Sequence, residues 1–436
     1  MVIKKLMPQA EEPLNNKDAR PVSWLKKLGP GLITGAADDD PSGIATYSQA
    51  GAQFGFNMLW TVLLTYPFMV AIQIVSARIG RVSGHGLATN IRQHYPARLL
   101  YAIVGLLLVA NTINIAADVA AMASALKLMI GGYTHTYVIG FGIISLLLQL
   151  FIPYRRYLRL LKWLTLSLLA YVASVFAVHI PWQQVFMATV LPHLSWKPTY
   201  ITTVVAVFGT TISPYLFFWQ ASQEVEELHA DPEAKKLKDA LNQATWNFRR
   251  IKIDTVIGMA FSNGVAFCII LTTAVTLHLH GLTEIHTSAQ AASALRPIAA
   301  EFAFWLFSAG IIGTGLLAIR VLAGSAAYAI AGAFHWHNSL ELKPMVAKGF
   351  YGIIALSTIF GVGLCFTSID PIKALYWSAV INGVISVPIM AVMMLMAARP
   401  DIMNQFVITL KLRLLGWTCT ATMAIAVAAM FWSLEV

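Results

Sequence analysis

The stretch Gly-Pro-Gly-Leu-Ile-Thr-Gly-Ala-Ala-Asp-Asp-Asp-Pro-Ser-Gly, residues 29–43, opens the first long apolar run of the chain. It places three carboxylates and a proline near the middle of a segment that is otherwise apolar enough to cross a membrane. Each Asp at the centre of a membrane helix costs about 2.5–3.5 kcal/mol, so we expect these side chains to face a cavity, an ion or a polar partner. Pro41 removes a backbone donor and frees the carbonyl one turn earlier. The stretch therefore predicts a helix that unwinds around Asp38–Gly43 and exposes carbonyl oxygens beside carboxylates.

The composition of the chain is that of an integral membrane protein. Of its 436 residues, 58% are hydrophobic and 11% are charged, whereas an ordinary soluble domain has about 25% charged residues. This balance excludes a typical soluble enzyme and a disordered chain. Because a transmembrane helix needs roughly 20 apolar residues, the pattern predicts about eleven membrane helices. Their expected limits are 28–50, 57–79, 99–130, 135–153, 160–180, 199–226, 252–279, 298–333, 349–367, 372–397 and 412–433.

The first 20 residues are rich in charged side chains and contain no apolar segment, so no cleaved signal peptide is predicted. The three cysteines, Cys268, Cys365 and Cys419, lie far apart within apolar runs. This spacing indicates neither a disulfide framework nor a zinc site. We expect no resident cofactor.

The basic residues follow a pattern that predicts the orientation of the chain. The formal net charge is +10, and most Lys and Arg residues stand in the N-terminal tail and in every second connection between the apolar runs. Because Lys and Arg mark the cytoplasmic side, the N-terminus is expected inside and the C-terminus outside a bacterial inner (plasma) membrane. The lipid bilayer is thus the expected partner of these basic residues. Binding to nucleic acid is not expected, because the sequence contains no basic, aromatic-rich module. The charged stretch 224–250 is expected to be a helix end followed by a cytoplasmic loop.

A second interruption stands in the sixth run, at Phe-Gly-Thr-Thr-Ile-Ser-Pro-Tyr, residues 208–215. An ordinary proline kink is an alternative explanation of this segment taken alone. Interrupted helices at corresponding positions of two halves, however, indicate a midplane binding site in a transporter, and unwound backbone is tolerated where it lines a cavity. We therefore predict an all-α polytopic membrane protein in which the first and sixth helices are discontinuous.

The two breaks also predict how the chain is divided. Five helices separate them if each break begins one half of the molecule. The expected organisation is a cytoplasmic tail over 1–27, a first five-helix unit over 28–180, a second over 181–397 and an eleventh helix over 398–436.

The residue types at the breaks favour a hard divalent cation. Carboxylates, carbonyls and hydroxyls are oxygen ligands that suit Mg²⁺, Mn²⁺ or Ca²⁺, and neither break contains a thiolate or a thioether. We expect Asp40 to ligate the ion directly. Asp38 and Asp39 are expected in a solvent-filled vestibule, where they act through water or by electrostatic attraction. Mg²⁺ sheds water reluctantly, and the small residues Gly43 and Ser213 are expected to leave room for its hydration shell.

Other intramembrane polar residues are candidates for the permeation path. Asn111, Asn114 and Asp118 share one helix face by their spacing, and acids inside a membrane are functional by default. Hydrogen bonding between helices is the alternative for this stripe. Gln73 is a candidate for the same cavity. Arg320 is costly inside a membrane, so it is expected to pair, to reach the interface or to act as a gate partner.

At these residues the sequence resembles the NRAMP family of divalent metal transporters, over almost all of its length. The first break resembles the family's Asp-Pro-Gly-Asn region, Asp118 its acidic position in the third helix, and 209–215 its sixth-helix Met-Pro-His motif. Further similar positions are Gly29-Pro30-Gly31, Ala45-Thr46, Gln49-Ala50-Gly51-Ala52, Gln73, Arg78, Gly80 and Gly84. The resemblance implies a LeuT-like fold, in which two inverted five-helix repeats are followed by one extra helix.

The departures from the family pattern change the expected chemistry. The family's metal-binding Asp is kept as Asp40, whereas its Asn becomes Gly43, its Met becomes Ser213, its His becomes Tyr215 and the Glu of its proton route becomes Ala121. This pattern resembles the divergent NRAMP-related magnesium transporter branch, which implies a larger site, a hydrated ion and transport without protons. The expected ligands are Asp40, Ser213, Ala37, Gly43 and Thr210, and the expected pathway residues are Asp38, Asp39, Asp118, Gln73, Asn114, Tyr215 and Arg320.

The sequence thus predicts a monomeric transporter, and not an enzyme, that moves Mg²⁺ and/or Mn²⁺ by alternating access. Uptake along an inside-negative potential gains about 4.6 kcal/mol per 100 mV for a dication and needs no proton. Four alternatives stay open: a proton-coupled Mn²⁺ or Fe²⁺ importer, a LeuT-like organic-solute symporter, an intramembrane aspartyl hydrolase and a channel.

Overall fold

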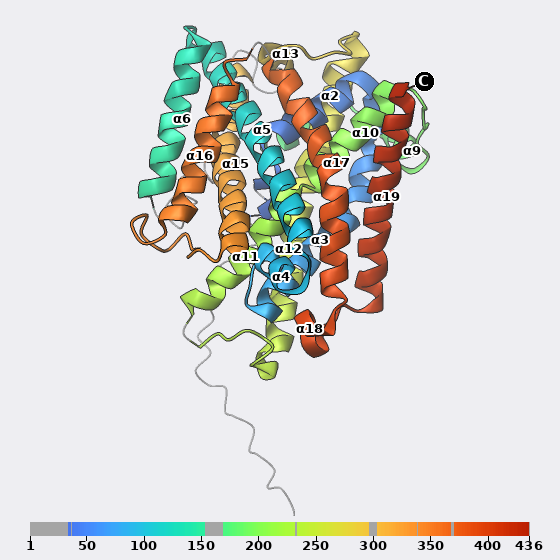
Figure 1. Cartoon of the computed structure of the whole chain (residues 1–436). Coiled ribbons are helices and arrows are strands. Elements are labelled where there is room, and N and C mark those ends of the chain that lie inside the picture. The colour runs from blue at the N-terminus through green and yellow to red at the C-terminus, as the bar shows by residue number, and fades with distance from the viewer. Residues whose placement is uncertain are drawn as a thin grey trace, which may run out of the picture.

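The protein folds into a bundle of long helices, most of which run along one common direction (Figure 1). The computed structural model describes residues 34–35, 37–152, 169–231, 233–295, 303–337, 339–367 and 370–435. Within these ranges every regular element is a helix. The predicted all-α class is therefore confirmed.

The helices follow one another along the chain with short connections. The elements up to residue 190 are α2 (Pro41–Phe54), the 3-10 turn η2 (Gly55–Met58), α3 (Leu59–Ser83), α4 (Leu87–His94), α5 (Ala97–Ile130), α6 (Thr134–Phe151), α8 (Leu169–Ala177) and α9 (Trp182–Val190). The later helices are α10 (Pro198–Thr211), α11 (Pro214–Ala230), α12 (Ala244–Thr276), α13 (Ser288–Ser293), α15 (Ala303–Phe334), α16 (Lys348–Leu364), α17 (Pro371–Ala397), α18 (Pro400–Met403) and α19 (Leu410–Glu435). Short 3-10 turns lie at Leu241–Gln243, His278–His280 and Asn404–Phe406.

Eight stretches of the described chain are long and apolar enough to cross a membrane, judged by length and composition. They account for all the predicted runs except two. The run 160–180 lies partly outside the described residues, and its described part forms α8. The run 349–367 forms α16, a shorter apolar helix. Since the beginning of the first run also lies outside the described residues, the exact number of membrane helices stays a prediction.

Several helices and boundaries were not predicted from apolar runs. α4 and α9 lie in connections, and α12 begins at Ala244, well before the expected residue 252. α4 buries Leu87 and Ile91 on one side and exposes polar residues on the other. A search for long apolar runs misses α4 because only one of its faces is apolar, and it misses α9 because nine residues are too few to form such a run.

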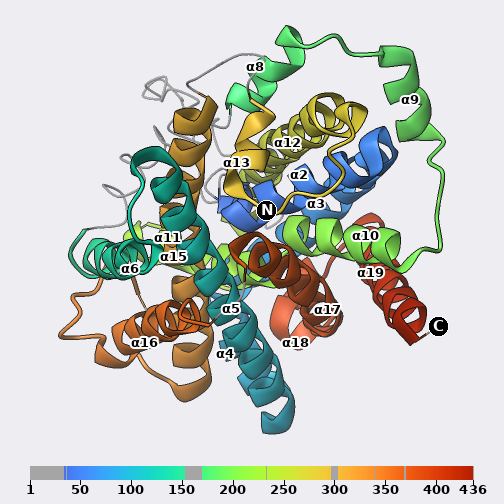
Figure 2. The same ribbon diagram turned by 90° about the horizontal axis from the view of Figure 1, so that it is seen from above.

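The broken helices meet in the middle of the bundle. Seen from above, α2 lies inside a ring formed by α5, α10, α12 and α17 (Figure 2). Two close glycine contacts hold α10 and α11 in place. Gly209 of α10 packs against the backbone of Ala379 and Gly383 in α17, and Gly80 of α3 packs against the backbone of Ala221 in α11, so that a Cβ at either glycine would overlap backbone atoms.

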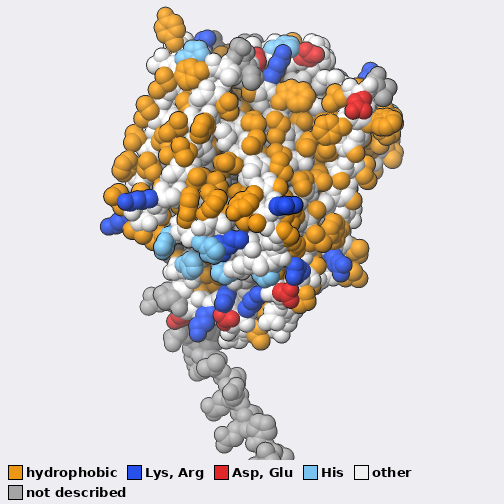
Figure 3. Space-filling model, in the orientation of Figure 1, with side chains coloured by type: hydrophobic (Ala, Val, Ile, Leu, Met, Phe, Trp, Pro, Cys, Tyr) orange, Lys and Arg blue, Asp and Glu red, His pale blue; other side chains and the backbone are white. Residues whose placement is uncertain are grey.

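The two ends of the bundle differ in charge. Figure 3 shows a broad belt of apolar side chains, with Lys and Arg side chains gathered toward the lower end. At this end two basic side chains contact Asp401. The Lys238 ammonium donates to the backbone carbonyl of Asp401 at 2.7 Å, and the Arg399 guanidinium pairs with the Asp401 carboxylate at 2.8 Å. The C-terminal end of α19 lies at the opposite, upper end (Figure 1). That the basic end faces the cytoplasm stays a prediction.

Candidate functional site

The first predicted break is present and is shorter than expected. Described residues up to Asp38 are helical, Asp39 and Asp40 leave the helix, and α2 begins at Pro41. Asp40 caps α2, because its Oδ1 accepts a hydrogen bond from the Gly43 amide at 2.7 Å. Pro41 occupies the first helical position, where no N–H is needed. The capping explains why the backbone does not stay unwound as far as Gly43.

The second break separates α10 from α11 at Ile212 and Ser213. The Ser213 hydroxyl donates to the carbonyls of Gly209 at 2.9 Å and Thr210 at 2.6 Å. Its side chain thus satisfies carbonyl groups that the end of α10 leaves without helical partners. A break is therefore present at this position, and not a kink within one continuous helix.

Asp40 lies where the two breaks meet. The Tyr215 hydroxyl, on the first turn of α11, contacts the carbonyl of Ala37 at 3.2 Å and Oδ2 of Asp40 at 3.3 Å. The Asn114 amide, on α5, donates to the same carboxylate oxygen at 3.1 Å. Asp40 is buried. Two predicted pathway residues, Asn114 on α5 and Tyr215 on α11, thus reach the carboxylate of Asp40, which itself caps α2.

The polar stripe on α5 divides between two roles. Asn114 reaches Asp40, whereas Asn111 donates to the Leu322 carbonyl and the Ser325 hydroxyl of α15, each at 2.8 Å. Asp118 is fully buried, and neither of its carboxylate oxygens has a hydrogen-bond partner in the described part of the chain. Asn111 therefore forms hydrogen bonds between helices, whereas Asn114 belongs to the site around Asp40.

Asp38 and Asp39 do not lie in a solvent-filled vestibule, as the sequence analysis expected. Their exposed fractions are 0% and 1%. Ser262 of α12 contacts both carboxylates, at 2.6 Å from Oδ2 of Asp38 and 3.2 Å from Oδ1 of Asp39. The packing of α12 against α2 excludes water from this side of the break. Ser262 was not predicted, because a single serine in an apolar run carries no recognisable signal.

The space beside the small residues is also smaller than expected. A Cβ atom at Gly43 would lie 3.2 Å from Oγ1 of Thr210, 3.3 Å from the Asp38 carbonyl and 3.4 Å from the Tyr47 ring. The Tyr47 hydroxyl is in turn 2.9 Å from Oγ1 of Thr211. Tyr47 and Thr210 therefore fill the volume that was expected to hold a hydration shell. Among the described residues, no three His, Cys, Asp or Glu side chains are arranged to hold a metal ion in this conformation.

Gln73 and Arg320 are not brought to Asp40. Gln73 is buried in α3, and its carbonyl oxygen has no hydrogen-bond partner among the described residues. The Arg320 guanidinium donates to the carbonyls of Leu148 at 3.4 Å and Ile152 at 3.1 Å, at the C-terminal end of α6. A cation at this position complements the helix dipole. The contacts favour a structural role for Arg320 over that of a gate partner.

A hollow at the upper end of the bundle, where the C-terminal end of α19 lies, leads toward the site along one face of α2. Its volume is about 300 Å³, and its lining includes Ala45, Gln49 and Gln53 together with residues of α10 and α17. These three positions are four residues apart and therefore share one helix face. Below them, the Ser42 hydroxyl contacts the Leu375 carbonyl at 2.9 Å and the Ser378 hydroxyl at 3.0 Å. This contact between α2 and α17 separates the hollow from the Asp40 site.

Comparison with known proteins assigns the family. The family model described as natural resistance-associated macrophage protein-like, or Nramp, matches residues 31–433. The chain belongs to the Nramp family. This Nramp chain is similar to the divalent metal cation transporter MntH of Klebsiella pneumoniae (strain 342). The two sequences are 25% identical over 415 residues, which cover 93% of this chain and 94% of the relative.

Solved structures confirm the LeuT-like fold of this Nramp protein. The manganese transporter of Eremococcus coleocola, crystallised with an aromatic bis-isothiourea substituted compound, has a TM-score of 0.71 at 18% identity, covering 93% of this chain and 87% of that one. MhsT in complex with L-phenylalanine has a TM-score of 0.61 at 10% identity, covering 92% of this chain and 98% of that one. At these identities the likeness concerns the fold.

Proposed function

We propose that this Nramp protein transports divalent metal cations across the membrane, and that the ion binds at Asp40 between the two helix breaks. The observation that carries the proposal is the convergence of α2, α5 and α11 on one buried carboxylate, through Asn114 and Tyr215. A buried charge at a helix break has the form expected of a transporter binding site. The relatives named as a divalent metal cation transporter and a manganese transporter support the same substrate class.

The substrate we propose is Mg²⁺ and/or Mn²⁺. The groups at the two breaks are carboxylate, hydroxyl and carbonyl oxygens, which are the ligands that these ions prefer. The residue types at 38–43 and 208–215 include no sulfur. Softer transition metals therefore gain no particular advantage at this site. Asp40 is the direct ligand in this proposal, with Ala37, Gly43, Thr210 and Ser213 around it.

The compact state around Gly43 and the outer hollow support alternating access. In the conformation described, Tyr47 and Thr210 occupy the space beside the break, and Ser42 closes it toward the outside. Separation of α2 from α17 at Ser42 opens the outer hollow to Asp40. Uptake in the direction of the basic end of the bundle follows from the proposed orientation, and an inside-negative potential drives it.

We propose that this uptake is not coupled to protons. Relative to the family pattern implied by the sequence resemblance, Tyr215 and Ala121 stand in place of a His and a Glu. Neither replacement exchanges a proton readily near neutral pH. Proton coupling is the second candidate mechanism, because Asp118 is a buried acid whose carboxylate oxygens make no hydrogen bond within the described residues.

Uptake into proteoliposomes tests the proposed function. Mg²⁺ and Mn²⁺ uptake is followed under an inside-negative potential while the internal pH is recorded. We expect saturable uptake without acidification, and at least about a hundredfold loss in Asp40→Asn, because a buried ion then lacks its balancing charge. Asp239→Asn is the matched control, since Asp239 is 57% exposed at the surface. Saturable uptake that survives in Asp40→Asn would contradict the site, and acidification during uptake would contradict the uncoupled mechanism.

A further inference from the structure

Charged side chains gather on the lower half of α11, away from Asp40. Oε2 of Glu224 lies 2.5 Å from Nη2 of Arg250 on α12, and Oε2 of Glu227 lies 3.0 Å from Nη1 of the same guanidinium. The Glu224 side chain is fully buried, and that of Arg250 is 9% exposed. Arg81, at the end of α3, is buried nearby and adds a second positive charge that acts on Glu224. The cluster therefore joins α3, α11 and α12.

The ion pair between Glu224 and Arg250 is unlike one that serves stability alone. The cost of removing both charges from water offsets their attraction, so buried pairs contribute little net stability. This pair is also incompletely hydrogen-bonded, because Oε1 of Glu224 is buried without a hydrogen-bond partner in the described ranges. Loss of one partner is nevertheless costly, since it leaves the other charge buried and unpaired. A pair of this kind specifies one relative position of its two helices.

α11 connects this ion pair to the Asp40 site. The helix begins directly after the second break, and Tyr215 on its first turn contacts Asp40. Glu224 lies roughly nine residues further along α11, about 13.5 Å along the axis at 1.5 Å per residue. Because a helix moves as a unit, displacement at Glu224 tilts α11 about the break at 212–213 and shifts the Tyr215 hydroxyl.

A second carboxylate anchors α11 to α15 and the loop that follows it. Glu226 accepts hydrogen bonds from the Tyr328 hydroxyl at 2.6 Å, the Ser339 hydroxyl at 2.7 Å and the Leu340 amide at 3.0 Å. Both oxygens of this carboxylate have partners, whereas only one oxygen of Glu224 has one. The contact with α12 is therefore the less completely bonded of the two anchors, and it is the one expected to separate.

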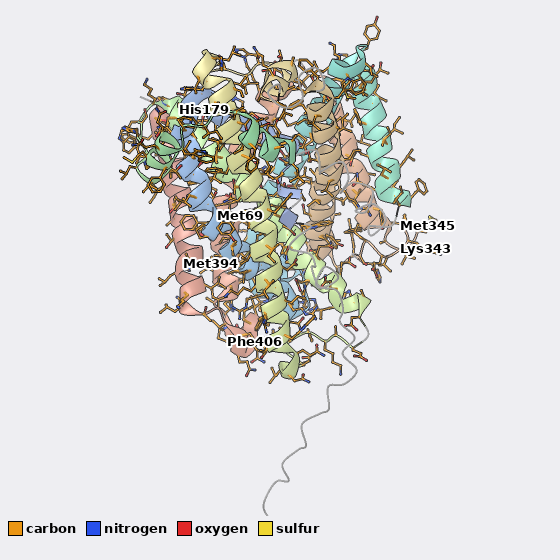
Figure 4. The ribbon with its side chains drawn as sticks, turned by 180° about the vertical axis from the view of Figure 1, so that it is seen from behind. Met69, His179, Lys343, Met345, Met394 and Phe406 are labelled. Carbon is orange, nitrogen blue, oxygen red and sulfur yellow. The ribbon has the colours of Figure 1, made fainter. Side chains whose placement is uncertain are left out.

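The lower end of α12 is itself held by aromatic packing. Phe248 lies edge-on to Phe406 at 5.3 Å between ring centroids, and the Arg78 guanidinium lies 4.1 Å from the Phe248 ring centroid. Figure 4 shows Phe406 near the lower end of α12, with Met69 at about the middle of the bundle. α12 is thus fixed to α3 and to the segment after α18. α11 keeps its own contacts with α3 and α15, so separation of the pair tilts α11 and does not detach it.

We propose that Glu224 and Arg250 are positioning residues of the transport cycle. When paired, they hold α11 so that Tyr215 contacts Asp40. When they separate, α11 tilts away from α12, Tyr215 leaves Asp40, and the ion is released toward the basic end of the bundle. The proposal deepens the proposed function and rests on it for the flux measurement, whereas the position of α11 can be measured without it.

Spin-label distances test the position of α11 directly. Labels are placed at Thr245→Cys, an exposed position near the start of α12, and at Ala230→Cys, at the end of α11. The full-length protein, with its three native cysteines replaced, is studied in nanodiscs. We expect one dominant distance in the parent and a second, longer one in Arg250→Met. Arg250→Lys keeps the charge and is expected to restore the parent distance. Arg249→Met is the matched control, because Arg249 is exposed.

Uptake kinetics give the readout that a purely structural role would not change. In Arg250→Met we expect the maximal rate of Mg²⁺ or Mn²⁺ uptake to change at least about tenfold, together with a rise of roughly threefold to tenfold in the half-saturation concentration, because Tyr215 no longer stays on Asp40. Glu224→Gln combined with Arg250→Met is expected to be no worse than either single variant, since both charges are then absent. If the variants at the buried residues do not fold, Glu227→Gln replaces them in both measurements, because Glu227 also pairs with Arg250 and is partly exposed.

Two results would overturn this inference. One is an unchanged distance between α12 and α11 in Arg250→Met and Glu227→Gln. The other is a rate that falls only in proportion to the amount of folded protein, with no recovery in Arg250→Lys. A parent protein that moves no divalent cation would instead refute the proposed function, and the distance measurement would still decide the role of the ion pair.

Discussion

The hydroxyl of Tyr215 lies 3.3 Å from Oδ2 of Asp40, although the two residues are 175 positions apart in the sequence. Asp40 caps α2 through the Gly43 amide, and Tyr215 stands on the first turn of α11. One carboxylate therefore contacts one half of each broken helix, α2 and α11. Any ion that binds Asp40 competes with these hydrogen bonds, so that binding and the arrangement of the two breaks are linked.

Tyr215→Phe tests this link. Loss of the hydroxyl removes one donor to the Asp40 carboxylate, and a hydrogen bond of this kind contributes about 0.5–1.5 kcal/mol net. We expect the half-saturation concentration for divalent cation uptake to rise by roughly threefold to tenfold, because the carboxylate is less firmly oriented. Tyr133→Phe, at a side chain that is 83% exposed, is expected to leave uptake unchanged. Identical kinetics in the two variants would show that Tyr215 does not act on the ion site.

Ser213→Met tests the selectivity of the site. A thioether is a softer ligand than a hydroxyl, and softer ligands favour transition metals over Mg²⁺. We expect the ability of Mn²⁺ to compete with Mg²⁺ to increase by about fivefold or more, measured as inhibition of Mg²⁺ uptake. Ser433→Met, on α19, introduces the same side chain far from both breaks. If the competition is the same in both variants, the side chain of residue 213 does not face the ion.

Ser262→Ala tests the support of the two carboxylates that precede Asp40. The serine hydroxyl lies 2.6 Å from Asp38 and 3.2 Å from Asp39, and its removal leaves buried carboxylate oxygens without a donor. We expect a loss of about 1–3 kcal/mol in stability, measured as a lower midpoint of thermal unfolding in detergent. Ser262→Thr retains the hydroxyl and is expected to recover most of the loss. Equal midpoints for Ser262→Ala and the parent would mean that this contact is not formed in the protein.

Gly209→Ala tests the close packing of α10 on α17. A Cβ at residue 209 would overlap the backbone of Ala379 and Gly383, and forced overpacking costs about 1–3 kcal/mol. Gly105→Ala is the matched control within α5, because nothing lies within 4 Å of its Cβ position. There we expect a gain of about 0.5–1 kcal/mol from helix propensity. A Gly209→Ala protein as stable as Gly105→Ala would disprove the close contact.

Much of the architecture could be predicted from the sequence, because the bilayer imposes simple rules on length and polarity. Apolar runs located nearly all the long helices. A proline in each of two runs located the breaks, together with three aspartates in the first and small hydroxyl residues in the second. The short helix α4 was missed because an amphipathic segment has no continuous apolar run, and α9 was missed because its nine residues are too few to form a membrane-length run. Asp38 and Asp39 were misplaced for a different reason: the exposure of an acid depends on what packs against it, and α12 covers this side of the break.

By itself, the sequence determined that the chain is an all-α membrane protein with two interrupted helices and an acid, Asp40, at the first interruption. These features follow from local composition and from the cost of polar groups in hydrocarbon. The tertiary structure alone decided which partners these residues have. It placed Asn114 and Tyr215 on Asp40, turned the Ser213 hydroxyl back onto α10, and directed Arg320 to the end of α6. Such choices depend on how helices distant in the sequence cross, which no local pattern encodes.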